Sequence, residues 1–220
     1  MKVICVIPAF NEEKTIAKVI NDVRPFVSEI IVVDDGSKDK TAEIAEGENV
    51  KVLRHLINRD QGAALETGNR YSLSKGAEII VHFDADGQFL AEEIERVIKP
   101  IKDGNADIVF GSRFMGIRSN MPFIKEYFIM PLARVINKIF FNIKMTDPQS
   151  GFRAMSADAA KKIKIEQDGK AHCSEIIAKA AKEKLRIVEV PIKVIYNEYG
   201  QNFSGGLRII KDFIIKELIK

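Results

Sequence analysis

Apolar residues along this chain follow two kinds of pattern. Short runs rich in valine and isoleucine alternate with longer segments in which apolar residues recur every three or four positions. The short runs predict β-strands, which we place at residues 2–8, 29–35, 50–55, 77–84, 106–112 and 186–196. Because almost every position in several of these runs is apolar, we expect strands that are covered on both faces, as in a parallel sheet.

The longer segments predict helices between the strands, at residues 12–24, 39–46, 62–75, 90–102 and 173–184. Asp39 and Thr41 are typical of a helix start, and Gly47 and Gly104 are typical of helix ends. The alternation of strand and helix favours right-handed crossovers. We therefore expect an α/β fold with a mainly parallel central sheet and helices on both faces. No repeat or Pro/Gly-rich linker divides the sequence, so residues 1–220 are expected to form one domain.

Two amphipathic helical segments are expected in the second half, at about residues 120–143 and 205–220. From residue 113 to residue 145 the local net charge is +5, because one acidic residue (Glu126) stands among six basic residues: Arg113, Arg118, Lys125, Arg134, Lys138 and Lys144. Basic amphipathic helices can lie in the bilayer interface, so we expect contact with a membrane surface. The alternative is that both helices pack on the sheet or on a second subunit.

No part of the sequence predicts insertion across a membrane. The N-terminal apolar stretch is too short for a signal peptide, and no run reaches the roughly 18 apolar residues of a transmembrane helix. The net charge of +3 is too small to indicate a nucleic-acid partner. Cys5 and Cys173 match no metal-ligand spacing, and Cys5 is expected to be a buried free thiol. We expect a cytoplasmic protein, peripheral on the cytosolic face of the membrane.

Polar residues follow four of the predicted strands. These residues are Asn11 and Glu12 after the first, Asp34 and Asp35 at the end of the second, Asp84 and Asp86 at the end of the fourth, and Gly111, Ser112 and Arg113 at the end of the fifth. In an open α/β sheet, ligands bind outside the carboxyl ends of the strands. The sequence therefore predicts one ligand site at this edge.

The stretch "VHFDADGQ" places Asp84, Asp86 and Gln88 on a turn that contains Gly87. These are hard oxygen ligands, which suit Mg²⁺ or Mn²⁺. With no soft ligands or histidine pair beside them, zinc is not expected; His82, in the preceding strand, is expected to be packed. The alternative interpretation is that Asp84 caps the next helix and Asp86 is only solvated.

The stretch "VVDDGSKDKT" ends a strand with two carboxylates that can accept hydrogen bonds from a base or from ribose hydroxyls. The alternative is a simple Asp-Gly turn. Absence of a G-x-G-x-x-G or G-x-x-x-x-G-K-[ST] motif argues against NAD and against a P-loop. No Ser-His-Asp or Cys-His arrangement stands out either, so nucleophilic catalysis by the protein is not expected.

Five strings occur in order between about residues 3 and 196: "IPAFNEEKTI", "IIVVDDGSKDKT", "FDADGQ", "GSRF" and "TDPQSGFRAMS". Together they resemble glycosyltransferase family 2. The last two narrow the resemblance to its dolichyl-phosphate mannosyltransferase-like branch of polyprenyl-phosphate glycosyltransferases. The resemblance implies a GT-A (Rossmann-like) fold and an inverting transfer of a hexose from GDP-mannose or a UDP-sugar to dolichyl or polyprenyl phosphate, with Mg²⁺ or Mn²⁺ as cofactor.

The resemblance also implies roles for particular residues. Donor contacts would come from Pro8, Ala9, Phe10, Asn11, Glu12, Asp34, Asp35 and Asp84. The metal ligands would be Asp84, Asp86 and Gln88. The catalytic residues would be Asp86, Asp147 near the reacting centre, and Arg113 and Arg153, which would face phosphates.

The chain departs from the branch at two places. Gln61-Gly62 stands where the branch usually has Lys-Gly, and Asn197 and Glu198 stand where it usually has an arginine followed by Ser-Lys. These departures weigh against mannose as the sugar and against the usual phosphate clamp. Three alternatives stay open: transfer to a soluble or protein-bound acceptor, a non-catalytic nucleotide-sugar-binding protein, and a phosphoacceptor signalling module. The last needs an acidic pair after the first strand, where this chain has "PAFNE".

Overall fold

The structure is a computed structural model that describes residues 1–115 and 145–195. Its centre is a seven-stranded sheet in the order β3-β2-β1-β4-β6-β5-β7. The strands are β1 (Val3–Ala9), β2 (Glu29–Asp34), β3 (Lys51–Arg54), β4 (Ile79–His82), β5 (Ile108–Ser112), β6 (Arg153–Ser156) and β7 (Ile187–Pro191). Among these strands only β6 runs antiparallel to its neighbours β4 and β5. The expected mainly parallel sheet is therefore confirmed.

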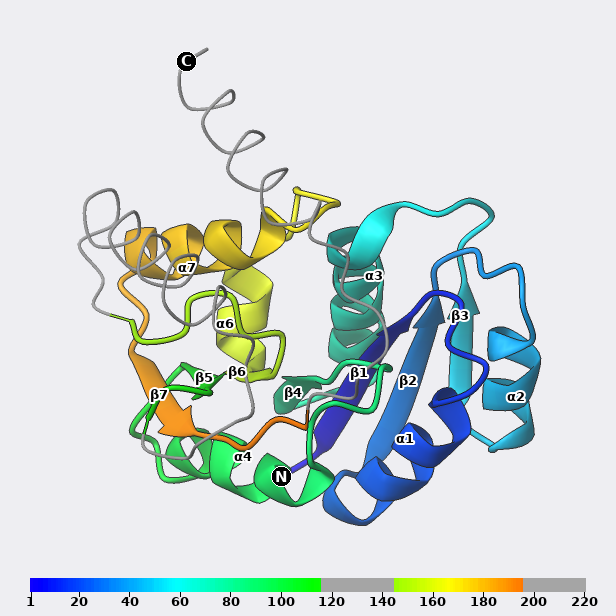
Figure 1. Ribbon diagram of the computed structural model, residues 1–220. Coiled ribbons are helices and arrows are strands. Elements are labelled where there is room, and N and C mark those ends of the chain that lie inside the picture. Colours follow the sequence, from blue (N-terminus) through cyan, green and yellow to red (C-terminus); the bar gives the residue numbers. More distant parts are fainter. Residues whose placement is uncertain (116–144, 196–220) are drawn as a thin grey trace.

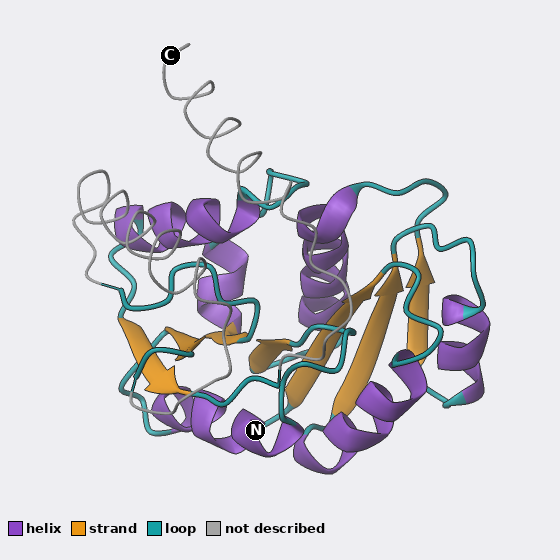
Figure 2. Cartoon of the chain, viewed as in Figure 1, coloured by secondary structure: helices purple, strands orange, loops and turns teal. Residues whose placement is uncertain are grey.

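Helices cover both faces of this sheet, as Figures 1 and 2 show. The helices are α1 (Ile16–Val23), α2 (Thr41–Gly47), α3 (Asp60–Ser74), α4 (Ile94–Lys102), α6 (Ala157–Lys162) and α7 (His172–Lys182), with short 3₁₀ turns η1 (Arg24–Phe26) and η2 (Ala91–Glu93). Helices α1, α2 and α4 lie on one face, and α3, α6 and α7 lie on the other. Within the described ranges, no helix is long and apolar enough to cross a bilayer.

The predicted elements that fall within the described residues are all present, with shifted ends. The helix expected from residue 12 begins at Ile16, because Glu12 to Thr15 form a turn in which the carbonyl of Glu12 accepts from the Thr15 and Ile16 amides. Strand β6 and helix α6 were not predicted. The amphipathic segments expected at about 120–143 and 205–220 lie outside the described residues.

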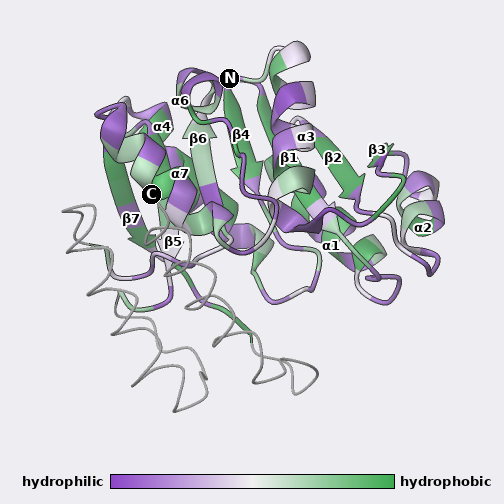
Figure 3. Cartoon of the chain, turned by 90° about the horizontal axis from the view of Figure 1, so that it is seen from above, coloured by the Kyte–Doolittle hydropathy of each residue, from purple (hydrophilic) through white to green (hydrophobic). Residues whose placement is uncertain are grey.

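The core is built by the alternation of side chains along the strands. In β1, Cys5 and Ile7 enter the cluster under α1 and α4, whereas Ile4 and Val6 enter the cluster under α3, α6 and α7. This two-sided burial explains why the strands read as continuous apolar runs, and Figure 3 shows them mostly in the hydrophobic colour. Cys5 is a buried free thiol, as expected.

Candidate active site

The carboxyl ends of β2, β1 and β4 lie side by side at one edge of the sheet. The three strands are neighbours and parallel, with Ala9 paired to Asp34 and Val6 paired to His82. The polar residues that follow them must therefore emerge at the same edge. The sequence prediction of a shared edge is confirmed for these three strands. Strand β5 is separated from β4 by β6, so its polar end lies further along the edge.

The pKa of Asp84 is strongly perturbed. Burial and, after it, the neighbouring Asp86 carboxylate raise the pKa of Asp84 to about 7, although the Arg153 guanidinium opposes them. One carboxylate oxygen of Asp84, Oδ1, accepts a hydrogen bond of 2.7 Å from Gln61 Nε2. Two carboxylates that disfavour each other's charge in a largely buried place are the setting in which a bound cation is most stabilising.

The residues present fit a hard divalent cation. Asp86 Oδ1 accepts from the Gln88 backbone amide at 3.0 Å, which shapes the turn after β4. Asp84 and Asp86 supply the carboxylates of this turn. Across the described part of the chain, no three His, Cys, Asp or Glu side chains converge as a complete metal cage. Mg²⁺ in particular is commonly held by one or two carboxylates together with water and substrate phosphates. The pair therefore fits an ion that shares its coordination with a phosphorylated ligand.

The backbone of Gly151 packs directly against the Asp84 carboxylate. A Cβ at position 151 would lie 2.4 Å from Asp84 Oδ2, closer than side chains approach one another. The backbone of the loop before β6 thus packs against one oxygen of Asp84, while Gln61 holds the other. The carboxylate is fixed from both sides, and only a glycine permits this approach.

The turn after β1 is tied to the loop after β2. The Asn11 amide donates to Ser37 Oγ at 2.9 Å, and Asn11 Oδ1 accepts from the Lys38 amide at 2.9 Å. Asn11 has a φ of 56°, a conformation that asparagine tolerates better than most residues. Phe10, beside it, is 42% exposed, whereas Pro8 and Ala9 are buried in β1. An exposed aromatic ring on a fixed turn is available to a flat ligand.

Glu12, in the turn after β1, interacts with the Asp86 carboxylate. Burial raises the pKa of Glu12, Asp86 and Asp39 raise it further, and a hydrogen bond from Thr15 opposes them. The Glu12 amide is fixed by Thr41 Oγ1 at 2.8 Å. The edge is therefore acidic over several loops, which favours cations and cation-bound anions.

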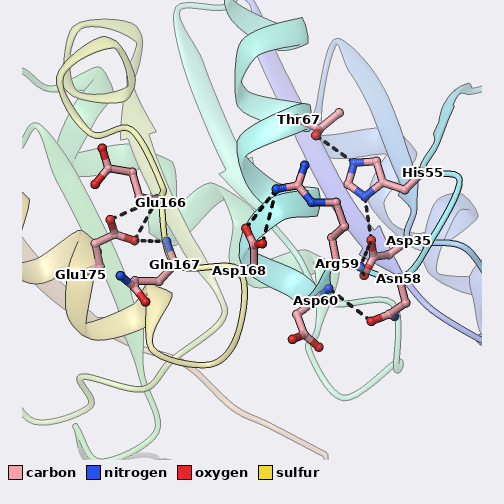
Figure 4. A network of polar contacts seen from close by, with 10 residues as sticks. All are labelled: Asp35, His55, Asn58, Arg59, Asp60, Thr67, Glu166, Gln167, Asp168 and Glu175. Atoms are coloured by element: carbon pink, nitrogen blue, oxygen red, sulfur yellow. Dashed lines mark hydrogen bonds and ion pairs between the residues drawn. The ribbon is translucent and has the colours of Figure 1, made fainter. Parts of the chain in front are cut away.

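Asp35 is the centre of a network shown in Figure 4. Its Oδ1 lies 2.6 Å from His55 Nδ1, and both carboxylate oxygens accept from the Arg59 amide at 3.0 and 3.1 Å. His55 Nε2 in turn contacts Thr67 Oγ1 at 2.9 Å. Asp34, one residue earlier, is also buried, and its Oδ1 accepts from the Ser37 amide at 3.4 Å. The sequence analysis gave no role to His55. Its position directly after the strand β3 could have indicated that it lies at the same edge of the sheet.

Arg113 and Asp147 form a bidentate ion pair. Arg113 Nε lies 2.6 Å from Asp147 Oδ2, Nη2 lies 2.7 Å from Oδ1, and the Arg113 amide also reaches Oδ2 at 3.1 Å. The exposed fractions of the two side chains are 10% and 0%. Glu189 of β7 orders the loop, because its carboxylate accepts from the amides of Thr146 and Asp147 at 2.7 and 2.8 Å. The structure thus brings Arg113 and Asp147 together, as two of the predicted site residues. The sequence analysis did not predict a role for Glu189.

Arg153 begins β6 and is fully buried, with an exposed fraction of 0%. Its guanidinium contacts Cys173 at the start of α7, a residue the sequence left without a role. His82 is packed in β4 as predicted, with Nε2 2.8 Å from Asn69 Oδ1, and burial holds its pKa well below the usual range. The phosphate-facing role expected for Arg113 and Arg153 stays a prediction, and both side chains already have partners within the protein.

The chain matches the family model for Glycosyl transferase family 2 over residues 4–164. It is 36% identical to the UDP-N-acetylglucosamine–dolichyl-phosphate N-acetylglucosaminyltransferase of Methanococcus voltae, over 98% of this chain and 96% of that protein. It is 31% identical to the undecaprenyl-phosphate mannosyltransferase of Micrococcus luteus, over 94% of this chain and 83% of that protein.

The fold is also similar to a solved structure, glucosyl-3-phosphoglycerate synthase from Mycobacterium tuberculosis in complex with Mn²⁺, UDP and phosphoglyceric acid. The TM-score is 0.73 at 19% identity, covering 97% of this chain and 77% of that one. At this level of identity the likeness concerns the fold alone, and it confirms the fold class expected from the sequence.

Proposed function

Because the chain belongs to glycosyl transferase family 2, we propose that it transfers a hexosyl unit from a nucleoside-diphosphate sugar to dolichyl or another polyprenyl phosphate. The two relatives described above are named as sugar transferases, one acting on dolichyl phosphate and the other on undecaprenyl phosphate. The sugar and the base are left open, since those two names specify different sugars.

One observation carries the proposal beyond family membership. Arg59 and Gln61 are two residues apart, and they bind Asp35 and Asp84 respectively. Successive Cα atoms are about 3.8 Å apart, so this turn brings the two carboxylates within roughly the length of a nucleotide. A donor lying along the turn would place its nucleoside at Asp35 and its diphosphate at Asp84. Pro8, Ala9, Phe10 and the neighbouring donor-site residues would form the side of this site made by β1.

Asp84 and Asp86, with Gln88 in the same turn, would hold Mg²⁺ or Mn²⁺ against the donor diphosphate. When bound, the ion supplies Lewis-acid stabilisation of the charge that develops on the leaving nucleoside diphosphate. The protein's own contribution is positional, because Gln61 and Gly151 fix the Asp84 carboxylate before the donor arrives. A preorganised carboxylate needs no rearrangement during the reaction.

The acceptor is an ionised phosphate at neutral pH, so its oxygen can attack without a strong general base. We infer that the attack is in line with the leaving group and inverts the anomeric centre. Arg113 and Arg153 would orient phosphate oxygens, and Asp147 would hold the Arg113 fork in a fixed plane. Most of the rate would then come from positioning and electrostatics.

The lipid acceptor requires access to a membrane. We propose that the protein binds the membrane surface peripherally, on the cytosolic face, through basic amphipathic segments at about residues 120–143 and 205–220. Both segments lie outside the described residues, and the support is the sequence pattern of apolar and basic positions.

The test is transfer by purified protein given a polyprenyl phosphate, Mg²⁺ or Mn²⁺, and a panel of UDP- and GDP-sugars. We expect one donor to be used and a glycosyl phosphate to appear in the lipid fraction only with the metal. A matched reaction lacking the lipid phosphate separates transfer from donor hydrolysis. Donor binding without transfer to any lipid phosphate would contradict the proposal and favour a binding protein or a different acceptor.

A further inference from the structure

A buried cluster of three polar side chains lies close enough to Asp84 to interact with its charge. Arg153 of β6 meets His172 and Cys173, the first two residues of α7. Their exposed fractions are 0%, 1% and 7%. Cys173 Sγ lies 3.3 Å from Arg153 Nη2 and 3.4 Å from His172 Nε2. The proposed function uses Arg153 but gives no role to the other two residues.

In the described part of the chain Arg153 makes no hydrogen bond or ion pair with a carboxylate, although the Asp84 carboxylate is near enough to feel its charge. Its Nε reaches the Gly151 carbonyl at 3.4 Å, its guanidinium lies over the Phe110 ring, and Nη1 has no hydrogen-bond partner there. No ion pair joins Arg153 to an Asp or Glu among the residues described. A guanidinium stays charged at every accessible pH, and burying it without an anion is costly. The atom best placed to supply negative charge is the sulfur of Cys173.

The hydrogen bonds of His172 indicate the protonation pattern. His172 Nδ1 lies 2.9 Å from the Gly169 carbonyl oxygen, which can only accept, so Nδ1 carries a proton. Nε2 then either accepts from a neutral S–H or, in the imidazolium, donates to a thiolate. Arg153 Nη2 can only donate. A thiolate therefore satisfies both neighbours at once.

We propose that Cys173 is held as a thiolate, the counter-ion that fixes Arg153 next to Gly151 and the Asp84 carboxylate. Burial opposes this ionisation, yet His172 and Arg153 bring the pKa of Cys173 down to about 6. Burial would also lower the pKa of His172, but the Cys173 sulfur raises it.

Two further titratable groups face the cluster, His82 from β4 and Asp84 from the loop after it. Burial holds the pKa of His82 well below its usual range, so it adds no charge, and the Arg153 and His172 cations lower that pKa further. Among the residues described, no hydrogen bond or ion pair joins the Asp84 carboxylate to Arg153, whereas Cys173 Sγ lies 3.3 Å from Arg153 Nη2. The sulfur is then the anion in contact with Arg153.

The consequence for the site is positional. Arg153 Nε bonds the carbonyl of Gly151, and the backbone of Gly151 abuts Asp84 Oδ2. A guanidinium held by Cys173 thus stabilises the loop that fixes the proposed metal ligand. This consequence rests on the proposed function, whereas the ionisation of Cys173 does not.

The chain supplies its own control for the ionisation. Cys5 is also buried, but in the apolar core, where burial raises its pKa and no cation offsets it. The absorbance of the thiolate at about 240 nm would be measured as a function of pH in wild type, Cys5→Ala and Cys173→Ala. We expect one thiolate per chain at neutral pH with a midpoint of about 6, retained in Cys5→Ala and absent in Cys173→Ala. If Cys5→Ala shows a thiolate only above about pH 8, the ordinary range of a free cysteine, the proposal is overturned; this arm holds even where Cys173→Ala does not fold.

A second arm tests the positional role by calorimetric binding of UDP and GDP with Mn²⁺. We expect Cys173→Ala to bind about tenfold more weakly and Cys173→Asp, which restores an anion, to recover much of the loss. A demonstrated thiolate together with unchanged binding by Cys173→Ala overturns the positional role. If wild type binds neither nucleotide, it is the proposed function that fails, while the thiolate titration still decides the ionisation.

Discussion

The side-chain amide of Gln61 donates a 2.7 Å hydrogen bond to Oδ1 of Asp84 and so joins the first turn of α3 to the loop after β4. The related branch of the family usually carries a lysine at this position. An amide orients the carboxylate but leaves its negative charge unneutralised. Asp84 is therefore both fixed in direction and still in need of a cation, which is the basis of the first predictions.

Removing either charge of the acidic pair should abolish metal-dependent donor binding. Asp84→Asn and Asp86→Asn keep the volume of the side chain but replace a carboxylate ligand with an amide. We expect both variants to lose transfer and Mn²⁺-dependent nucleotide binding, while far-UV circular dichroism matches wild type. Full activity of either variant in the presence of chelator would show that the pair holds no catalytic cation.

Without metal, Asp84 should make stability depend on pH. Its pKa in the folded protein is raised to about 7, above the value near 3.9 expected in the unfolded chain, so the folded state holds a proton that the unfolded state releases. Its contribution to the free energy of unfolding is therefore full below about pH 4 and is lost as pH rises to about 7. In chelator at about pH 8, Asp84→Asn should be more stable than wild type by on the order of 2 kcal/mol.

Urea unfolding of both proteins across this pH range checks the prediction, because their difference isolates Asp84 from other titrating groups. Saturating Mn²⁺ should reduce the difference, since a cation stabilises the ionised carboxylate. If the two proteins keep the same difference in stability from about pH 4 to about pH 8, Asp84 titrates normally.

The contact between Gly151 and Asp84 predicts a sharp effect of one methyl group. In Gly151→Ala the Cβ would lie 2.4 Å from Asp84 Oδ2, so the carboxylate or the loop must move. We expect the affinity for Mn²⁺ with nucleotide to fall at least about tenfold and stability to fall by about 1–3 kcal/mol. Gly47→Ala is the matched control, because a Cβ at position 47 meets nothing within 4 Å. Equal effects of the two substitutions would rule out this mechanism.

Breaking the Arg113–Asp147 pair should lower both stability and activity, and the two effects can be measured separately. Arg113→Lys removes the bidentate fork and should lower the free energy of unfolding by about 1–3 kcal/mol. If Arg113 also orients a phosphate, kcat/KM should fall at least about tenfold at temperatures where the variant stays folded.

The control is Arg186→Lys, since Arg186 makes the same two-pronged pair with Asp107 at 3.0 and 2.7 Å but is 56% exposed. This exposed pair should matter little. A folded Arg113→Lys protein with wild-type kcat/KM would assign the arginine a structural role only.

Membrane binding is predicted from the basic amphipathic segments. We expect wild type to sediment with anionic liposomes at low salt and to be released at high salt, since each basic residue near such a surface is worth about 1 kcal/mol. Deleting residues 207–220 should weaken sedimentation, and transfer to a short, water-soluble polyprenyl phosphate should survive the deletion better than transfer to a long one. Wild type that stays in the supernatant at low salt would show the membrane prediction to be wrong.

Much of the fold was predictable because it is encoded locally. Runs such as "VICVIP" and "EIIVVD" are apolar at almost every position, so they are fully buried only in strands that are covered on both faces. The carboxylates that follow them are where the chain leaves the core, so the shared edge of Asp34, Asp35 and Asp84 followed from strand direction alone. Two of the five strings that carry the family resemblance contain these same edge residues.

The tertiary structure alone decided what those residues touch. Strand β6, "RAMS", has no apolar run of its own and exists because β4 and β5 pair with it on both sides. Arg153 contacts Cys173, and Gln61 contacts Asp84. In each pair the two residues are about 20 positions apart in the sequence. Periodicity records which side chains leave water, but hydrogen-bond partners and protonation depend on distances across the folded chain, which no local pattern contains.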